Sequence, residues 1–263
     1  MAINKTVPWL IILVVLGVAV AWYLYQRPAP EVHPSVASLP KMVEQGPPAQ
    51  PQYPMEALEP AQGSQAEPVP PLAESDEAVI RALGEWLDAG TLDALLVREQ
   101  IIPRVVASID SLDSRELAPL VMPVRPPPGA FQASAGDVLT INPANFERYA
   151  PYANLVRAVP VEGAVAFYRR HYPLFQQAYE DLGHPDAYFN DRLVAVIDHL
   201  LATPVPEQPP VLLKPETAYV FEDEGLEALT AGQKILLRIG PEQAALVRER
   251  LRAMRGAITR EGF

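Results

Sequence analysis

Residues Val165 to Leu201, VAFYRRHYPLFQQAYEDLGHPDAYFNDRLVAVIDHLL, form the longest periodic stretch of the 263-residue chain outside its apolar start. In the first half, large apolar side chains recur every three or four residues, which places them on one stripe of a helix. Gly183 ends this helix with a residue able to adopt positive φ, and Pro185 begins the next. We therefore predict a tight helical hairpin, kinked at Pro173. The stripe of the first helix consists of Val165, Tyr168, Tyr172, Phe175, Tyr179 and Leu182.

The second helix of the hairpin carries a wider apolar stripe, so we expect it to be buried on more than one side. This hairpin should be the centre around which the rest of the folded domain packs. The stripe consists of Phe189, Leu193, Val196 or Ile197, and Leu200 or Leu201.

The hairpin also holds the chain's main concentration of polar side chains that could carry chemistry. Asp191 and Asp198 are seven residues apart and share a helix face at about 10 Å, the far edge of the carboxylate separation in inverting glycosidases. The alternative is that polar residues beside an apolar stripe form salt bridges or a solvated face. The candidate cluster, if the protein is an enzyme, is His171, Asp191, Arg192, Asp198 and His199.

The spacing of potential ligands argues against a metal site. Paired ligands on a helix need a separation of three or four residues, and in the hairpin only Glu180 and His184 offer it, with Gly183 between them. The sequence also lacks a glycine-rich phosphate loop, a GxSxG motif and an HExxH motif. We therefore assign no catalytic, cofactor-binding or metal-binding residue from the sequence.

The composition excludes several classes of function. The formal net charge is −11, and the basic run near the C-terminus falls on two sides of one helix, so we expect no nucleic-acid partner. The chain has no cysteine, which excludes disulfides, thiolate nucleophiles and cysteine-ligated zinc.

The first 27 residues are predicted to anchor the chain in a membrane. Residues 7–25 contain no charge, are long enough to span a bilayer, and carry Trp and Tyr residues near both ends. The alternative is a cleaved signal peptide, because Ala19-Val20-Ala21 fits a cleavage site. The short amino-terminal tail favours a cytoplasmic N-terminus. In a bacterium this predicts a single-pass inner-membrane protein whose C-terminal domain is periplasmic.

Residues 28–74 are predicted to be a disordered linker. Twelve prolines lie in this range with only scattered apolar residues, so it cannot build a core of its own. We expect extended polyproline conformations and the role of a semi-rigid spacer.

Residues 75–263 should form a compact, mainly α domain. A hairpin turning at residues 135–137 and a second short β-ribbon joining residues 211–213 to 219–221 are the expected strands. Helices are expected from Ser75 or Asp76 toward Gly90, from Thr91, over 98–112, from Pro143 to Tyr149, in a further segment from Tyr152, over 230–239, and from Pro241 to the C-terminal end.

One family resemblance rests on YRRHYPLFQQAYEDLGHPDAYFNDRLVAVIDHLLATP and the later GQKILLRIGPEQA. These stretches resemble the bacterial domain-of-unknown-function family numbered 3014, over about residues 75–258. The resemblance implies a bacterial, often membrane-anchored protein with no assigned activity, so it carries no residue role onto this chain.

Three functions fit the sequence. The first is an envelope protein whose periplasmic domain binds a protein or cell-wall partner at a distance set by the linker. This interpretation makes the protein more a binding module than an enzyme. The second is a membrane-tethered envelope hydrolase using Asp191, Asp198 or His199, which requires these side chains to converge in a cleft. The third is a small-ligand sensor domain.

Overall fold

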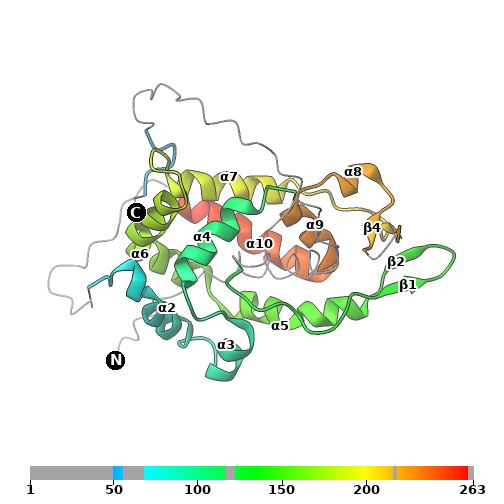
Figure 1. Cartoon of the computed structure of the whole chain (residues 1–263), viewed down its shortest axis with the longest axis horizontal. Coiled ribbons are helices and arrows are strands. Elements are labelled where there is room, and N and C mark those ends of the chain that lie inside the picture. The colour runs from blue at the N-terminus through cyan, green and yellow to red at the C-terminus, as the bar shows by residue number, and fades with distance from the viewer. Residues whose placement is uncertain (1–49, 56–67, 116–121, 216–217, 260–263) are drawn as a thin grey trace, which may run out of the picture.

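A computed structural model describes residues 50–55, 68–115, 122–215 and 218–259 of the chain (Figure 1). These residues form a mainly helical domain with a small antiparallel sheet at one end, which confirms the predicted fold class at this level. The proposed anchor, residues 7–25, lies outside the described residues. Within the described part of the chain, no helix has the length and apolar character needed to cross a bilayer.

The predicted hairpin is formed by α6 (Val161–Asp181) and α7 (Phe189–Leu201). Gly183 ends α6 with φ of 114°, a conformation that strongly favours glycine, as the sequence indicated. The predicted start of the second helix at Pro185 is wrong, because α7 begins at Phe189. The reason lies in α6, where the Gln176 side chain accepts a hydrogen bond from the Phe189 amide at 2.9 Å and so caps α7.

The predicted stripe of α6 is buried except at its last member. Val165, Tyr168, Phe175 and Tyr179 are buried and Tyr172 is partly buried, whereas Leu182 is 44% exposed beyond the end of the helix. A second face of α6 is also buried, through Phe167, His171, Leu174 and Ala178. The core therefore surrounds α6 more fully than the sequence stripe predicts.

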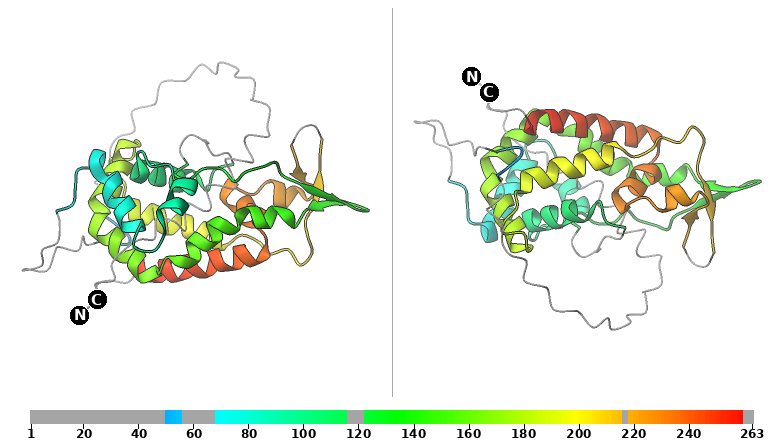
Figure 2. Two further views of the ribbon diagram at one scale, coloured as in Figure 1. Left: turned by 90° about the horizontal axis from the view of Figure 1, so that it is seen from below. Right: turned by 90° about the horizontal axis from the view of Figure 1, so that it is seen from above.

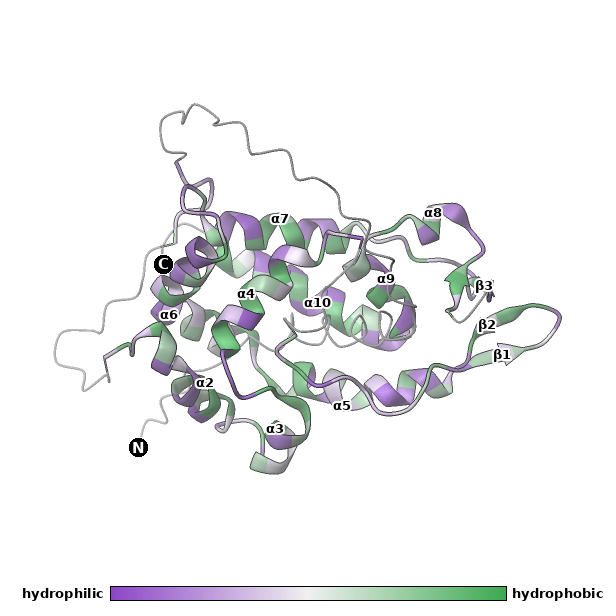
Figure 3. Cartoon of the chain, viewed as in Figure 1, coloured by the Kyte–Doolittle hydropathy of each residue, from purple (hydrophilic) through white to green (hydrophobic). Residues whose placement is uncertain are grey.

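The remaining helices pack around this hairpin (Figures 1 and 2). The long C-terminal helix α10 contacts α5, α6 and α7, while α4 contacts α2, α6 and α7. Hydrophobic and hydrophilic residues alternate along α4, α7 and α10, as expected for helices with one face in a core (Figure 3). The bounds are α2 Ser75–Leu83, α3 Ala89–Leu95, α4 Ile101–Ser111, α5 Ala144–Ala158, α9 Ala231–Arg238 and α10 Pro241–Ile258, with the short η1 Leu72–Glu74 and α8 Glu224–Glu227.

The first helix begins at Ser75 as predicted, but it ends at Leu83 and not near Gly90, and two other local predictions are wrong. The helix expected to end at Tyr149 continues through Pro151 to Ala158 as a single helix. Asp76 does not cap its own helix α2; its carboxylate instead accepts the amides of Gln100 and Ile101, both at 2.8 Å, and thereby caps α4. For Asp76, a tertiary contact thus outweighs the local sequence signal.

The two predicted β-ribbons form one antiparallel sheet in the order β1-β2-β3-β4. Leu139 of β2 pairs with Leu212 of β3, which joins the ribbons. A small apolar cluster lies within this region, separate from the main core, and the β1–β2 hairpin projects away from the helices (Figure 1). The strands are β1 Ala133–Ala135, β2 Leu139–Ile141, β3 Val211–Leu213 and β4 Val220–Phe221, and the cluster consists of Phe131, Ile141, Leu212 and Phe221.

Part of the predicted linker lies on the helical domain. Residues 50–55 contact it at the end opposite the sheet, close to the C-terminal end of α10 (Figures 1 and 2). Tyr53 and Met55 pack against the main core. The proline-rich composition of residues 28–74 predicts a spacer without such contacts, so this docking is a feature that the sequence analysis missed.

Candidate functional site

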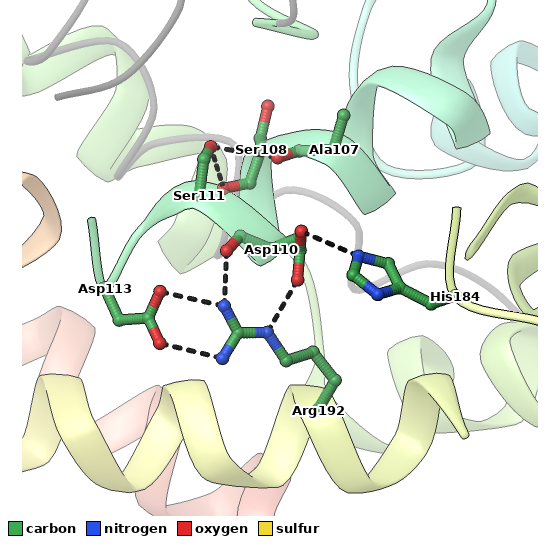
Figure 4. Close-up of polar contacts among 7 residues, drawn as sticks. All are labelled: Ala107, Ser108, Asp110, Ser111, Asp113, His184 and Arg192. Atoms are coloured by element: carbon green, nitrogen blue, oxygen red, sulfur yellow. Dashed lines mark hydrogen bonds and ion pairs between the residues drawn. The ribbon is translucent and has the colours of Figure 1, made fainter. Parts of the chain in front are cut away.

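Arg192 links the start of α7 to the end of α4 (Figure 4). Its Nε donates to Asp110 Oδ1 at 2.7 Å, and its two terminal nitrogens donate to the two carboxylate oxygens of Asp113 at 2.7 and 2.8 Å. One of these nitrogens also donates to the backbone carbonyl of Asp110. His184 lies on the far side of Asp110, with Nε2 at 3.3 Å from Oδ2.

The charges of this cluster explain its arrangement. Asp110 and Asp113 lie at the C-terminal end of α4, where the helix dipole disfavours negative charge and where α4 has no basic residue of its own. Arg192 supplies the positive charge that this end of α4 lacks. It also donates a hydrogen bond to the backbone carbonyl of Asp110. Hydrogen bonding to Arg192 lowers the pKa of Asp113, and the pKa of Arg192 is raised, first by Asp113. The cluster, in which one guanidinium bridges two carboxylates, is thus a clamp between two helices.

His171 is buried in the middle of α6. Its Nδ1 lies 2.9 Å from the Phe167 carbonyl oxygen, and its ring stacks on the Phe167 ring at 3.9 Å. Because a carbonyl can only accept, Nδ1 is the protonated nitrogen in this contact. Burial lowers the pKa of His171, which favours the neutral ring at pH 7.

Asp198 and His199 contact two other elements. Asp198 forms a bidentate ion pair with Arg255 of α10, and both side chains are partly solvent-exposed. His199 Nε2 lies 2.9 Å from the hydroxyl of Thr230, the residue that caps α9, and the His199 carbonyl accepts from Gln233. These residues attach α7 to α10 and to the start of α9.

Asp191 holds the docked linker segment. Its Oδ2 accepts the backbone amide of Gln52 and its Oδ1 accepts that of Tyr53, both at 2.8 Å. Asn190, which is fully buried, donates from Nδ2 to the Tyr53 carbonyl oxygen at 2.9 Å. Two consecutive residues at the start of α7 therefore bind the main chain of the segment on both its donor and its acceptor groups.

The sequence analysis did not identify Asn190, Gln52 or Tyr53. Asn190 follows an apolar residue and gives no periodic signal, and a carboxylate at Asp191 is expected at a helix start whether or not it binds another segment. The only sequence signal for the linker residues is the aromatic Tyr53 between Pro51 and Pro54, an apolar ring in a stretch predicted to be solvated.

The structure distributes the five candidate residues rather than joining them in one centre. Asp191 contacts the docked segment, Arg192 contacts α4, Asp198 contacts α10, His199 contacts the capping residue of α9, and His171 contacts its own helix. Among the residues that the structure describes, no group of three or more His, Asp or Glu side chains is placed to hold a metal ion.

The fold and these contacts define a mainly helical domain with a small antiparallel sheet, which holds a short segment of its own chain at one end. The chain belongs to the family described as Protein of unknown function (DUF3014), whose sequence model matches residues 101–255. The match confirms the family resemblance over a shorter range than the predicted residues 75–258. It includes Asn190 and Asp191 and excludes the docked segment. No curated protein and no solved structure matches the chain significantly.

Proposed function

We propose that this protein is a tethered binding module of the bacterial cell envelope. Residues 7–25 anchor it in the inner membrane as a single span, the proline-rich stretch separates the domain from the bilayer, and the periplasmic domain binds another envelope protein or a cell-wall component. The observation that supports this proposal most directly is the binding of residues 50–55 by Asn190 and Asp191. The domain surface holds a short segment of chain through specific hydrogen bonds to its backbone.

The contacts of the candidate polar residues support binding over hydrolysis. General acid–base catalysis needs an acid and a base within reach of the same reacting group. Asp191, Asp198 and His199 instead contact three different parts of the molecule. Their hydrogen bonds account for them as structural side chains that fix α7 and the docked segment.

Membrane topology and partner capture test the proposal. A reporter active only outside the cytoplasm, fused after Phe263, should be active, and the protein should resist extraction by salt and alkali. Photo-crosslinking in intact cells from exposed positions of the helical domain should then yield a discrete envelope partner. Release as a shortened soluble chain would show cleavage at Ala19-Val20-Ala21 and contradict the anchor.

Asp198→Asn separates the binding proposal from the hydrolase. The change keeps the shape of the side chain, removes its ability to transfer a proton, and weakens the ion pair with Arg255. We expect any loss of complementation in a deletion strain to follow a lower thermal midpoint. An unchanged midpoint with complete loss of function would favour the hydrolase.

A further inference from the structure

The docked segment, Gln50–Met55, binds as a short peptide that bends at Gln52 and Tyr53. Its burial alternates along the chain: Pro51, Tyr53 and Met55 are partly buried, whereas Gln52 and Pro54 are exposed. The bend turns the successive amides of Gln52 and Tyr53 toward the same carboxylate, which the alternating amides of an extended strand could not reach together. Tyr53 and Met55 supply the apolar contacts to the main core.

The domain recognises this segment largely through its main chain. Asp191 accepts two successive amides, and Asn190 donates to the carbonyl between Tyr53 and Pro54. None of these three bonds depends on the identity of a side chain in the segment. A carboxylate that accepts two backbone amides forms strong, charge-assisted bonds, and Asp76 binds the start of α4 in the same way.

The receiving side of the site is fixed by the core. Asn190 is fully buried, and its Oδ1 accepts the hydroxyl of Tyr168, a buried residue of α6, at 3.1 Å. Its Nδ2 also lies 3.4 Å from the Ile258 carbonyl oxygen at the end of α10. Three helices therefore orient this amide independently of the segment. Arg255 is held by Asp198, which is the main cause of its raised pKa, and Tyr53 raises that pKa further.

We propose that the Asn190–Asp191 site is the peptide-binding site of this protein, and that residues 50–55 are a resident occupant which a partner displaces. This inference rests on the proposed function and names its ligand: a peptide of another envelope protein that takes the same bent backbone, with an aromatic side chain where Tyr53 lies and apolar side chains two residues to either side. Recognition through the main chain permits such an exchange, because a different sequence can make the same three hydrogen bonds.

The resident segment also sets the strength of competition. Only residues 56–67 separate it from Pro68, where the described chain resumes. A short tether of this length holds an occupant at an effective concentration on the order of millimolar. A partner must therefore bind with high intrinsic affinity, or in several copies, before it replaces residues 50–55.

Peptide binding to the full-length protein in nanodiscs tests the inference. The probe is a fluorescent peptide with the sequence QPQYPM, followed by anisotropy up to millimolar protein. The double variant Gln52→Pro with Tyr53→Ala removes one amide donor and the aromatic ring from the resident segment without changing the site. We expect it to bind the peptide at least about tenfold more tightly than the wild type, since the tethered competitor is weakened.

Matched variants show whether binding occurs at this site. Asp191→Asn in the double-variant background should weaken peptide binding by about tenfold or more, because two charge-assisted bonds are lost. Asp76→Asn removes the same chemistry at the start of α4 and should leave peptide affinity unchanged. A peptide N-methylated at the amides corresponding to Gln52 and Tyr53 should not bind. Circular dichroism and thermal midpoints confirm that each variant is folded.

Three results would overturn the inference: no saturable binding to the folded double variant, equal binding to the wild type, or affinity unaffected by Asp191→Asn. Crosslinking in cells distinguishes this failure from that of the proposed function. If a partner crosslinks to the sheet region and no peptide binds at Asp191, the peptide-binding site is contradicted and the proposed binding module still stands. If the peptide binds at Asp191 but no partner is found in cells, the proposed binding module is contradicted, and the site serves only to bind residues 50–55 of the same chain.

Discussion

Arg192 and Asp191 are neighbours in α7, yet they hold different parts of the chain. Arg192 joins two helices through side-chain contacts to Asp110 and Asp113, and a large apolar core lies behind it. Asp191 holds a proline-rich segment through the backbone amides of Gln52 and Tyr53, with exposed residues on either side of Tyr53. The difference indicates that the helical body is held by contacts formed cooperatively over large buried areas, whereas the docked segment depends on a few local bonds and can exchange.

The largest loss of stability should come from a substitution in the core of the helical domain. Phe175 is fully buried between Tyr168 and Phe189, with ring centroids at 5.2 and 5.9 Å, so Phe175→Ala should lower the free energy of unfolding by about 3 to 5 kcal/mol. Leu182→Ala at the exposed end of the same hairpin arm is the control and should cost less than about 0.5 kcal/mol. Denaturant melts give both values; a cost below about 1 kcal/mol for Phe175→Ala would contradict the packing scheme.

The next largest effect should come from the clamp. Arg192→Ala removes the guanidinium that Asp110 and Asp113 share at the C-terminal end of α4, and we expect a loss of about 2 kcal/mol, below the value for a fully buried pair because the cluster is partly exposed. Arg98→Ala, which breaks the exposed pair with Asp93, should cost under about 1 kcal/mol. Thermal and denaturant melts measure the loss of stability in both variants. Equal losses would show that the clamp contributes no more than an exposed surface ion pair.

A smaller, pH-dependent effect should come from His171. Burial lowers its pKa below the ordinary value of 6.5, so the unfolded chain binds a proton more readily than the folded one. Its stabilising contribution is complete above pH 6.5 and declines as the pH falls from there toward the lower folded-state pKa. His171→Phe should flatten this part of the stability curve, while His199→Gln should retain it. A wild-type curve without this decline would show that His171 is not neutral and buried.

The smallest change in global stability should come from the docked segment. Asp191→Asn removes charge-assisted bonds to two amides outside the body, so we expect a cost of at most about 1 kcal/mol. Hydrogen exchange at Gln52 and Tyr53 should nevertheless accelerate strongly, with helical amides unaffected. Asp186→Asn, in the exposed loop before α7, serves as the control. If Asp191→Asn destabilised the whole domain as much as Phe175→Ala does, the segment would belong to the cooperative helical core, and the distinction between the two regions would be wrong.

The sequence predicts the helical hairpin because a regular apolar period reports burial directly. It correctly indicates Tyr168 and Phe175 in the core and Gly183 at the turn. It does not predict that α7 begins only at Phe189, because the side chain that caps α7 comes from Gln176 in another helix. It also shows two separate ribbons where the structure pairs β2 with β3, since pairing between distant strands has no local signal.

For the site, the sequence identifies Asp191 as one of several polar residues but not what it binds. The docked segment has the composition of a spacer, and its contacts depend on backbone atoms that every residue possesses. Asn190 matters because Tyr168, Ile258 and Tyr53 surround it in three dimensions. Such a residue becomes visible only when the helices are placed.

The position of residues 50–55 also determines how the protein would respond to mechanical load. The segment lies beside Ile258, so a pull on the chain before Gln50 acts first on the bonds of Asn190 and Asp191, not on the helical core. When those bonds break, the tether gains residues 50–55, which span at most about 20 Å when extended. The docked segment is thus placed to detach first under load, which lengthens the tether in one step while the domain stays folded.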